Sequence, residues 1–197
     1  RFTATNSMEP VKMNALMHMG HRNEKPRVPI STPYDNARRK KLMQTYVSRN
    51  LTHNNTLLKL PFYPHGAGHY TLKKGYNEYE SKEFSPFVAI NWIEKGDLEI
   101  TLYGKEHILH RNDVLIYLPG EERHRRVLSD DCEYRWITFS GERAPGHILS
   151  YGYDRIIRNA GPCPVELFRK IMEHISDADP FIQRMIISWV DQILAHA

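Results

Sequence analysis

The strongest constraint on the fold is a series of short apolar and β-branched segments between residues 87 and 139, each separated from the next by turn residues. Segments with period-two alternation, such as 98–103, are typical of half-buried strands. No interval between these segments is long enough for the helix that connects parallel strands. The sequence therefore predicts a mainly β fold, an antiparallel sandwich or barrel, with strands over 87–93, 98–103, 105–109, 113–118, 124–128 and 134–139.

Two helices are predicted at the C-terminal end of the chain, where the apolar period lengthens to that of a helix. The first covers 164–175, and the second begins at Pro180, because proline suits the first turn of a helix. The second helix carries an apolar stripe wider than a small sheet needs. We weigh two interpretations equally, a cover over one open end of the barrel and a dimer interface; the residues of the interface would be Ile182, Met185, Ile186, Trp189, Val190 and Ile193.

The first 60 residues differ from the rest in charge and in aromatic content. They contain 11 Lys or Arg and 3 Asp or Glu, a balance of +8, whereas residues 61–197 contain 16 and 20, a balance of −4. Few aromatic residues and an excess of charge predict a solvated basic arm with one short helix over 31–50. The alternative is an arm that contacts nucleic acid or another acidic surface.

Several functional classes receive no support from the sequence. No apolar run is long enough for a membrane span, the N-terminal residues lack the apolar segment of a secretory signal, and two cysteines, Cys132 and Cys163, cannot form a disulfide framework. We therefore expect a protein of the reducing cytoplasm that does not bind a membrane.

Catalytic and metal-binding motifs are not found either. No His-x-His pair occurs, and His107 and His110 would lie on opposite faces of a strand. Neither a nucleophile elbow nor a phosphate-binding glycine loop is present. We expect no metal, no cofactor and no enzymatic activity.

Binding of a small molecule is better supported by the last predicted strand. Period-two alternation places Tyr134, Trp136 and Thr138 on one face, and residues 135, 137 and 139 on the other. Both faces carry an aromatic residue, so either orientation brings one into the barrel interior, as in the aromatic ligand pockets of small barrels. The alternative is that Trp136 only packs in the core.

The order of several short motifs resembles the N-terminal sensor domain of AraC/XylS-type transcription regulators. The resemblance covers about 61–195 and is carried by Gly104 at a strand end, Asn112-Asp113 where the family has Gly-Asp, Pro119-Gly120 followed by His124, and the strand end Trp136-Ile137-Thr138-Phe139-Ser140-Gly141. It implies a cupin-like, jelly-roll type barrel followed by two helices. The domains would be a basic arm over 1–60, a sensor barrel over 61–161 and a helical dimerisation segment over 162–197.

The family resemblance also implies a function. Such domains bind a small effector, form homodimers and control a C-terminal helix-turn-helix module, which would follow this chain and through which alone it would contact DNA. An N-terminal arm closes over the effector in one member. The competing readings are a cupin-fold enzyme, such as a sugar isomerase or a dioxygenase, and a ligand-free dimerisation module whose barrel is filled by side chains.

The effector implied by the resemblance is a sugar or a sugar acid. Its contacts would be Lys95, Arg125, Tyr134, Trp136 and His124. Two cationic side chains in one partly dry pocket need an anion nearby, which favours a uronate-like carboxylate. The alternatives are that Glu133 or Glu99 neutralises the pair and the ligand is a neutral sugar, or that Arg125 faces water.

Overall fold

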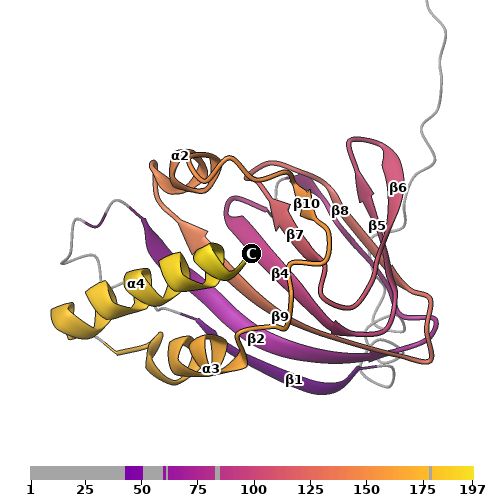
Figure 1. Ribbon diagram of the computed structural model, residues 1–197, viewed down its shortest axis with the longest axis horizontal. Helices are drawn as coiled ribbons and strands as arrows, with labels where there is room; N and C mark the ends of the chain where they lie inside the picture. The colour runs from indigo at the N-terminus through magenta and orange to yellow at the C-terminus, as the bar shows by residue number, and fades with distance from the viewer. Residues whose placement is uncertain (1–42, 51–59, 61, 83–84, 178) are drawn as a thin grey trace, which may run out of the picture.

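The computed structural model describes residues 43–50, 60, 62–82, 85–177 and 179–197 and contains two antiparallel sheets (Figure 1). One sheet has the strand order β1-β2-β9-β4-β7-β10, and the other has the order β3-β8-β5-β6. The strands are β1 (Met43–Asn50), β2 (Tyr63–Lys73), β3 (Asn77–Glu80), β4 (Val88–Lys95), β5 (Leu98–Leu102), β6 (Lys105–Leu109), β7 (Val114–Tyr117), β8 (Arg123–Val127), β9 (Asp131–Ser140) and β10 (Ile156–Ile157).

The predicted strands and the mainly β fold are confirmed. Strands β4 to β9 fall on the predicted segments, and every pair of neighbouring strands is antiparallel. The hairpin between β5 and β6 turns at Tyr103 and Gly104, whose φ angles of 53° and 73° are both positive. A two-residue turn of this kind matches the twist of its strands and favours glycine.

The six-stranded sheet is buried on both faces and separates two hydrophobic cores. Its outer face packs against the C-terminal helices through residues such as Trp92 and Phe139. Its inner face meets the four-stranded sheet through residues such as Ile93, opposite Leu98 and Ile100. Because a strand alternates its side chains, β4 supplies both cores and reads as a continuous apolar segment.

Three helices follow the last long strand: α2 (Ala144–Leu149), α3 (Val165–His174) and α4 (Pro180–His196). The two predicted helices are confirmed as α3 and α4, which lie side by side against the six-stranded sheet (Figure 1). The Asp179 carboxylate caps α4 by accepting the Phe181 N–H at 2.7 Å. None of the described helices is long and apolar enough to cross a membrane.

The helix predicted over 31–50 is wrong where the structure describes it. Met43–Asn50 forms strand β1, which pairs with β2 from Leu72 to Gly66. The segment contains Thr45, Tyr46 and Val47, which favour strands, and pairing with β2 satisfies its backbone, which outweighs the weak helix propensity of the neighbouring residues. The rest of that prediction, and nearly all of the basic arm, lies outside the described residues.

Strand β2 escapes the sequence analysis because Pro64, Gly66 and Gly68 resemble turn residues. In the structure β2 has a register shift between Pro64 and Gly66 and then pairs with β9 as far as Lys73. Glycine within a strand marks a bulge or a close approach, and Gly68 lies directly opposite Trp136. The glycines therefore belong to the strand that lies beside the aromatic residues of β9.

The turn before β7 supports a testable prediction at Asp113. Its buried carboxylate accepts hydrogen bonds from the backbone N–H of His110 and of Asn159, both at 3.0 Å, and from Arg158 at 2.5 Å. Burial alone raises the pKa of Asp113, but these donors outweigh it, and the pKa lies below its usual value. The carboxylate therefore contributes stability above about pH 4 that is lost as pH falls through the lowered pKa.

We expect Asp113→Asn to lower the free energy of unfolding by about 1–3 kcal/mol at pH 7, because it weakens hydrogen bonds to a charged acceptor. The difference should shrink at pH 3, where the wild-type carboxylate starts to become protonated. Urea unfolding at the two pH values measures it. An equal loss at both would contradict the role given to the charge.

Candidate functional site

The space between the two sheets is apolar at one end and polar at the other. Around Leu109 and Val127 it is closed by aliphatic side chains. Toward the start of β8 the inward positions carry Arg123 and Arg125 instead, which alternate with the outward His124 and Arg126. The inner face of the six-stranded sheet supplies Tyr117 and Tyr134 to the same region. We refer to Glu78, Glu80, Arg123, Arg125, Tyr117 and Tyr134 as the interior polar cluster.

Strand β3 supplies the carboxylates of this cluster. Glu78 lies opposite Arg125 and Glu80 opposite Arg123 in the β3–β8 register. Arg125 Nη2 lies 3.3 Å from an oxygen of each glutamate, and Arg125 Nη1 donates to the Tyr134 hydroxyl at 3.1 Å.

The second arginine of the cluster is held in a similar way. Arg123 Nη1 lies 3.7 Å from Glu80, and its Nη2 donates to the Phe87 carbonyl at 3.1 Å. Both guanidinium groups are almost fully buried, and both are paired with carboxylates. Such pairing is what makes a buried charge tolerable.

The protonation states in the cluster follow from burial and from these partners. Burial alone lowers the pKa of Arg125, but the Glu78 carboxylate and the other groups around it raise that pKa above its ordinary value. Burial raises the pKa of the Tyr134 and Tyr117 phenols, against the effect of the arginines. At neutral pH both arginines are charged, and both phenols keep the proton that they can donate.

Aromatic side chains form one wall beside the cluster. The Tyr70 ring stacks on Trp136 with centroids 5.7 Å apart and an interplanar angle of 24°, and it tilts against Tyr134 at 5.2 Å. Since Gly68 lies opposite Trp136, no β2 side chain stands across from the indole. The wall offers a flat apolar surface and a polar edge, which suits a ring that carries hydroxyl groups.

Four buried polar atoms in this region have no hydrogen-bond partner in the described part of the chain: Tyr117 Oη, Arg123 Nε, Arg125 Nε and Trp136 Nε1. Each of them can donate a hydrogen bond, and the three nitrogens cannot accept one. A buried donor without a partner is costly. The site is therefore suited to a molecule that presents several oxygen acceptors beside an apolar face.

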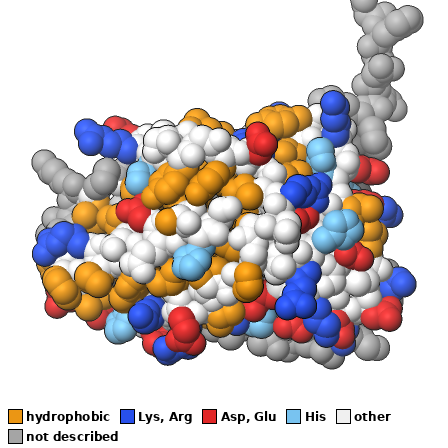
Figure 2. Space-filling model, viewed as in Figure 1, with side chains coloured by type: hydrophobic (Ala, Val, Ile, Leu, Met, Phe, Trp, Pro, Cys, Tyr) orange, Lys and Arg blue, Asp and Glu red, His pale blue; other side chains and the backbone are white. Residues whose placement is uncertain are grey.

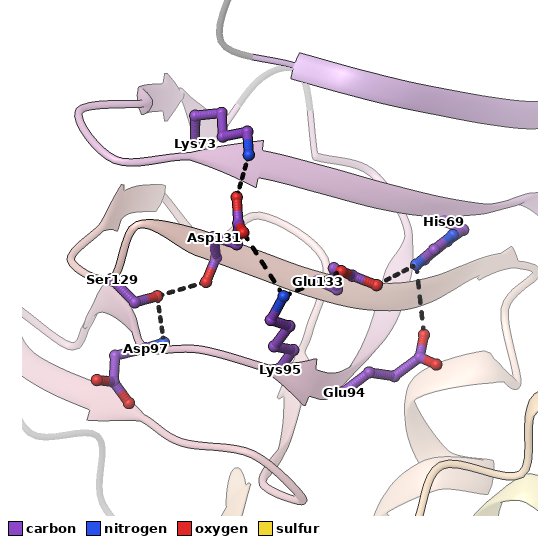
Figure 3. Close-up of polar contacts among 8 residues, drawn as sticks. All are labelled: His69, Lys73, Glu94, Lys95, Asp97, Ser129, Asp131 and Glu133. Carbon is purple, nitrogen blue, oxygen red and sulfur yellow. Dashed lines mark hydrogen bonds and ion pairs between the residues drawn. The ribbon is translucent and has the colours of Figure 1, made fainter.

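Lys95 does not join this site, so the prediction that it shares a pocket with Arg125 is wrong. Lys95 lies opposite Glu133, whose side chain is on the other face of β9 from Tyr134. A register shift between Ile93 and Lys95 places the lysine there. Its side chain is 58% exposed, and its Nζ lies 3.5 Å from Asp131 and 3.9 Å from Glu133 (Figure 3).

The expectation of a uronate-like ligand loses its basis with this placement. It rested on two uncompensated cations in one pocket, whereas Lys95 pairs with Glu133 and Arg125 pairs with Glu78 and Glu80. The alternative that Glu133 contributes to neutralisation agrees with the structure. Glu99 pairs instead with Arg126, at 2.6 Å.

His124 also lies outside the interior polar cluster. Its Nε2 is 2.8 Å from the Asn77 side-chain oxygen and its Nδ1 is 3.5 Å from the Thr101 hydroxyl, on the outer face of the four-stranded sheet. Of the five predicted ligand residues the structure brings together three, Arg125, Tyr134 and Trp136. The remaining cluster residues were missed, although Glu78 and Glu80 share the period-two spacing of Arg123 and Arg125.

Histidines and thiols outside the cluster offer little chemistry. Within the described ranges no group of three or more His, Cys, Asp or Glu residues is arranged to hold a metal ion. Burial raises the pKa of Cys132 to about 12 and also raises that of Cys163. Both thiols are therefore protonated at neutral pH and are poor nucleophiles.

The predicted dimer stripe on α4 divides into two parts. Ile186, Val190 and Ile193 are fully buried against the six-stranded sheet and the neighbouring helix, so these three residues serve the core of a single chain. Ile182, Met185 and Trp189 are partly exposed, and Phe181 is 59% exposed. Figure 2 shows hydrophobic side chains gathered along the outward side of α4.

Comparisons with solved structures place regulators and cupin domains among the similar folds. The chain matches an HTH_3 family transcriptional regulator from Vibrio cholerae (10% identity, TM-score 0.36) over 42% of its own length and 53% of the regulator, about half of that protein. It matches the Cupin_2 domain of an XRE family transcriptional regulator from Enterobacter cloacae (15%, 0.37) over 48% and 96% of the two chains. It matches the Cnp3 cupin domain of Schizosaccharomyces pombe (13%, 0.40) over 53% and 72%.

Among curated proteins no relative matches the chain. The family model of the AraC-like ligand binding domain matches residues 67–178. This span begins in β2, includes every strand of the interior polar cluster and ends after α3. Since the match covers more than half of the chain, the protein belongs to the AraC-like ligand-binding domain family, with the cupin-like fold expected of it.

Proposed function

We propose that this chain is the effector-sensing domain of a transcription regulator and that its effector is a sugar bound between the two sheets. Membership of the ligand-binding family supports a small-molecule effector. The observation that carries the choice of a sugar is the set of four unpartnered donors beside the Tyr70–Trp136 wall. Sugar oxygens accept hydrogen bonds, and the apolar face of a pyranose stacks on an aromatic ring.

The regulatory half of the proposal concerns a second module. A sensor of this family is useful only if it controls a DNA-binding domain, which we place after Ala197 in the complete protein. Two such modules on adjacent half-sites require a dimer, and the partly exposed residues of α4 offer a surface for it. Sequencing the gene beyond the codon for Ala197 tests the first point, because a helix-turn-helix there is required.

We propose that the domain acts in the cytoplasm and is not an enzyme. The two cysteines are unpaired, as is usual in a reducing compartment. The interior carboxylates are engaged by arginines rather than free to act as bases, and the thiols are protonated. The cupin-enzyme alternative would need a catalytic group that none of the described side chains supplies.

Replacing Trp136 with Ala tests the sugar site. The change removes the stacking surface and one unpartnered donor, and we expect about 10- to 100-fold weaker binding of the sugar that the wild type binds best. Calorimetric titration with a panel of neutral monosaccharides and the corresponding sugar acids measures it. The matched control is Trp189→Ala on α4, which lies outside the site and should leave the affinity unchanged.

Two results would refute the sugar site. One is the absence of binding for every member of the panel to the wild-type domain. The other is an affinity in Trp136→Ala equal to that of the wild type, with the far-ultraviolet circular dichroism of both proteins unchanged.

A further inference from the structure

We propose that Glu78 and Glu80 make the interior site selective for uncharged ligands and that replacing them with glutamine converts it into an anion site. This inference rests on the proposed function, because it concerns the ligand of the same site. It assigns a specificity role to two residues of the short strand β3, whose bounds are Asn77–Glu80.

The first argument is the balance of charge. Two carboxylates, Glu78 and Glu80, face the buried guanidinium of Arg125, and Glu80 also faces Arg123. The nearby Glu121 is engaged by Arg155 at 2.5 Å, so it does not alter this balance. Two positive and two negative groups leave the cluster without net charge. A ligand carboxylate that enters would be a third anion, desolvated and without a free cation.

The second argument is the geometry of the guanidinium groups. A carboxylate binds arginine best through two parallel N–H bonds. In Arg125, Nη1 is used by Tyr134 and Nη2 by the two glutamates. In Arg123, Nη1 faces Glu80 and Nη2 donates to Phe87. Each arginine therefore offers one unpartnered Nε–H, which suits a single neutral acceptor such as a hydroxyl oxygen.

The third argument is the position of the carboxylates in the fold. Strand β3 lies at the edge of the four-stranded sheet, and its register puts each glutamate directly across from an arginine. Cross-strand neighbours at this spacing interact directly. The selectivity is thus built into a local pairing of two strands, and Glu→Gln changes the charge with little change in shape.

The test compares the wild type with Glu78→Gln, Glu80→Gln and the double variant. The control is Glu142→Gln, an exposed carboxylate in the turn after β9. The probes are glucose with glucuronate, galactose with galacturonate, and sulfate as a simple anion. Thermal unfolding and calorimetric titration are recorded for each protein, and circular dichroism establishes that each variant is folded.

In the wild type we expect the neutral sugar of a pair to bind more tightly than its acid, and sulfate to give no stabilisation. Each single glutamine variant should bind the acid about tenfold more tightly than the wild type does. Sulfate should raise the unfolding temperature of the variants, most of all that of the double variant. Glu142→Gln should behave as the wild type. If the double variant does not fold, the two single variants decide the question.

The outcomes separate this inference from the proposed function. Uronates that bind the wild type as tightly as neutral sugars, or folded glutamine variants that gain nothing for uronates and sulfate, would overturn the selectivity role. If no sugar binds any of the proteins, the sugar function fails by itself. In that case sulfate still decides the selectivity, since stabilisation confined to the glutamine variants supports it and equal responses overturn it.

Discussion

Replacing Ile186 with Asp is expected to abolish folding of the domain, whereas replacing Trp189 with Asp is expected to leave a folded chain that no longer dimerises. Ile186 is fully buried in the core between the six-stranded sheet and the helices. A carboxylate at this position has no partner, and burying it costs several kcal/mol in addition to the lost apolar packing. A loss of about 5 kcal/mol or more matches the whole stability of many domains.

Trp189 lies on the same helix but is only partly buried, so the corresponding substitution should cost far less stability. Circular dichroism and chemical unfolding measure the folding effect, and sedimentation measures the mass of the assembly. Phe181→Asp, at a position 59% exposed, is a second surface variant that should remain folded. A cooperatively folded Ile186→Asp protein would contradict the assignment of this residue to the core. An unchanged mass in folded Trp189→Asp would exclude this side of α4 as the dimer surface.

The contrast between Ile186 and Trp189 shows a limit of helical periodicity. The sequence predicted α4 and its apolar stripe correctly, because side chains at helical spacing share a face. The width of a stripe does not tell which sector meets the sheet. In this fold the sheet and α3 cover Ile186, Val190 and Ile193 completely and leave Phe181 at the edge. That division depends on the packing angle of the helix, which sequence spacing does not contain.

The site shows a similar limit for strands. Alternation along β9 put Tyr134 and Trp136 on one face, and the structure agrees. For Lys95 the argument depended on a resemblance, and a register shift in β4 next to the lysine turns it toward Glu133. An irregularity of one residue reverses the face of a side chain. Such a bulge carries no clear signal in a single sequence.

Long-range pairing explains the remaining differences. Strand β1 is stabilised by β2, which is itself disguised by Pro64, Gly66 and Gly68. The glutamates of β3 acquire their role only through the register with β8. Both facts concern contacts between distant segments, whereas propensity and periodicity describe neighbours along the chain. The local features, such as the Gly104 hairpin and the Pro180 helix start, were accordingly predicted well.

Replacing Arg125 with Met is expected to lower the free energy of unfolding by about 3–5 kcal/mol, because it leaves buried carboxylates without their partner. The Arg125 side chain is 10% exposed, and it contacts Glu78, Glu80 and the Tyr134 hydroxyl. Glu80 retains Arg123 at 3.7 Å, but the ion pair described for Glu78 is lost. Methionine has a similar length and keeps the apolar packing of the stem, so the charge dominates the effect. Urea unfolding measures it, with the exposed Arg111→Met as the control that should unfold like the wild type.

A second substitution separates the missing charge from a missing contact. If the loss in Arg125→Met arises from an uncompensated Glu78 carboxylate, then Arg125→Met combined with Glu78→Gln should regain a large part of it, because the orphaned charge is gone. The four proteins form a double-mutant cycle, and we expect a coupling energy of about 1–3 kcal/mol. If the double variant is as unstable as the sum of the two single variants, Arg125 stabilises the fold by packing alone. The interior polar cluster would then owe nothing to the pairing of β3 with β8 that places Glu78 across from Arg125.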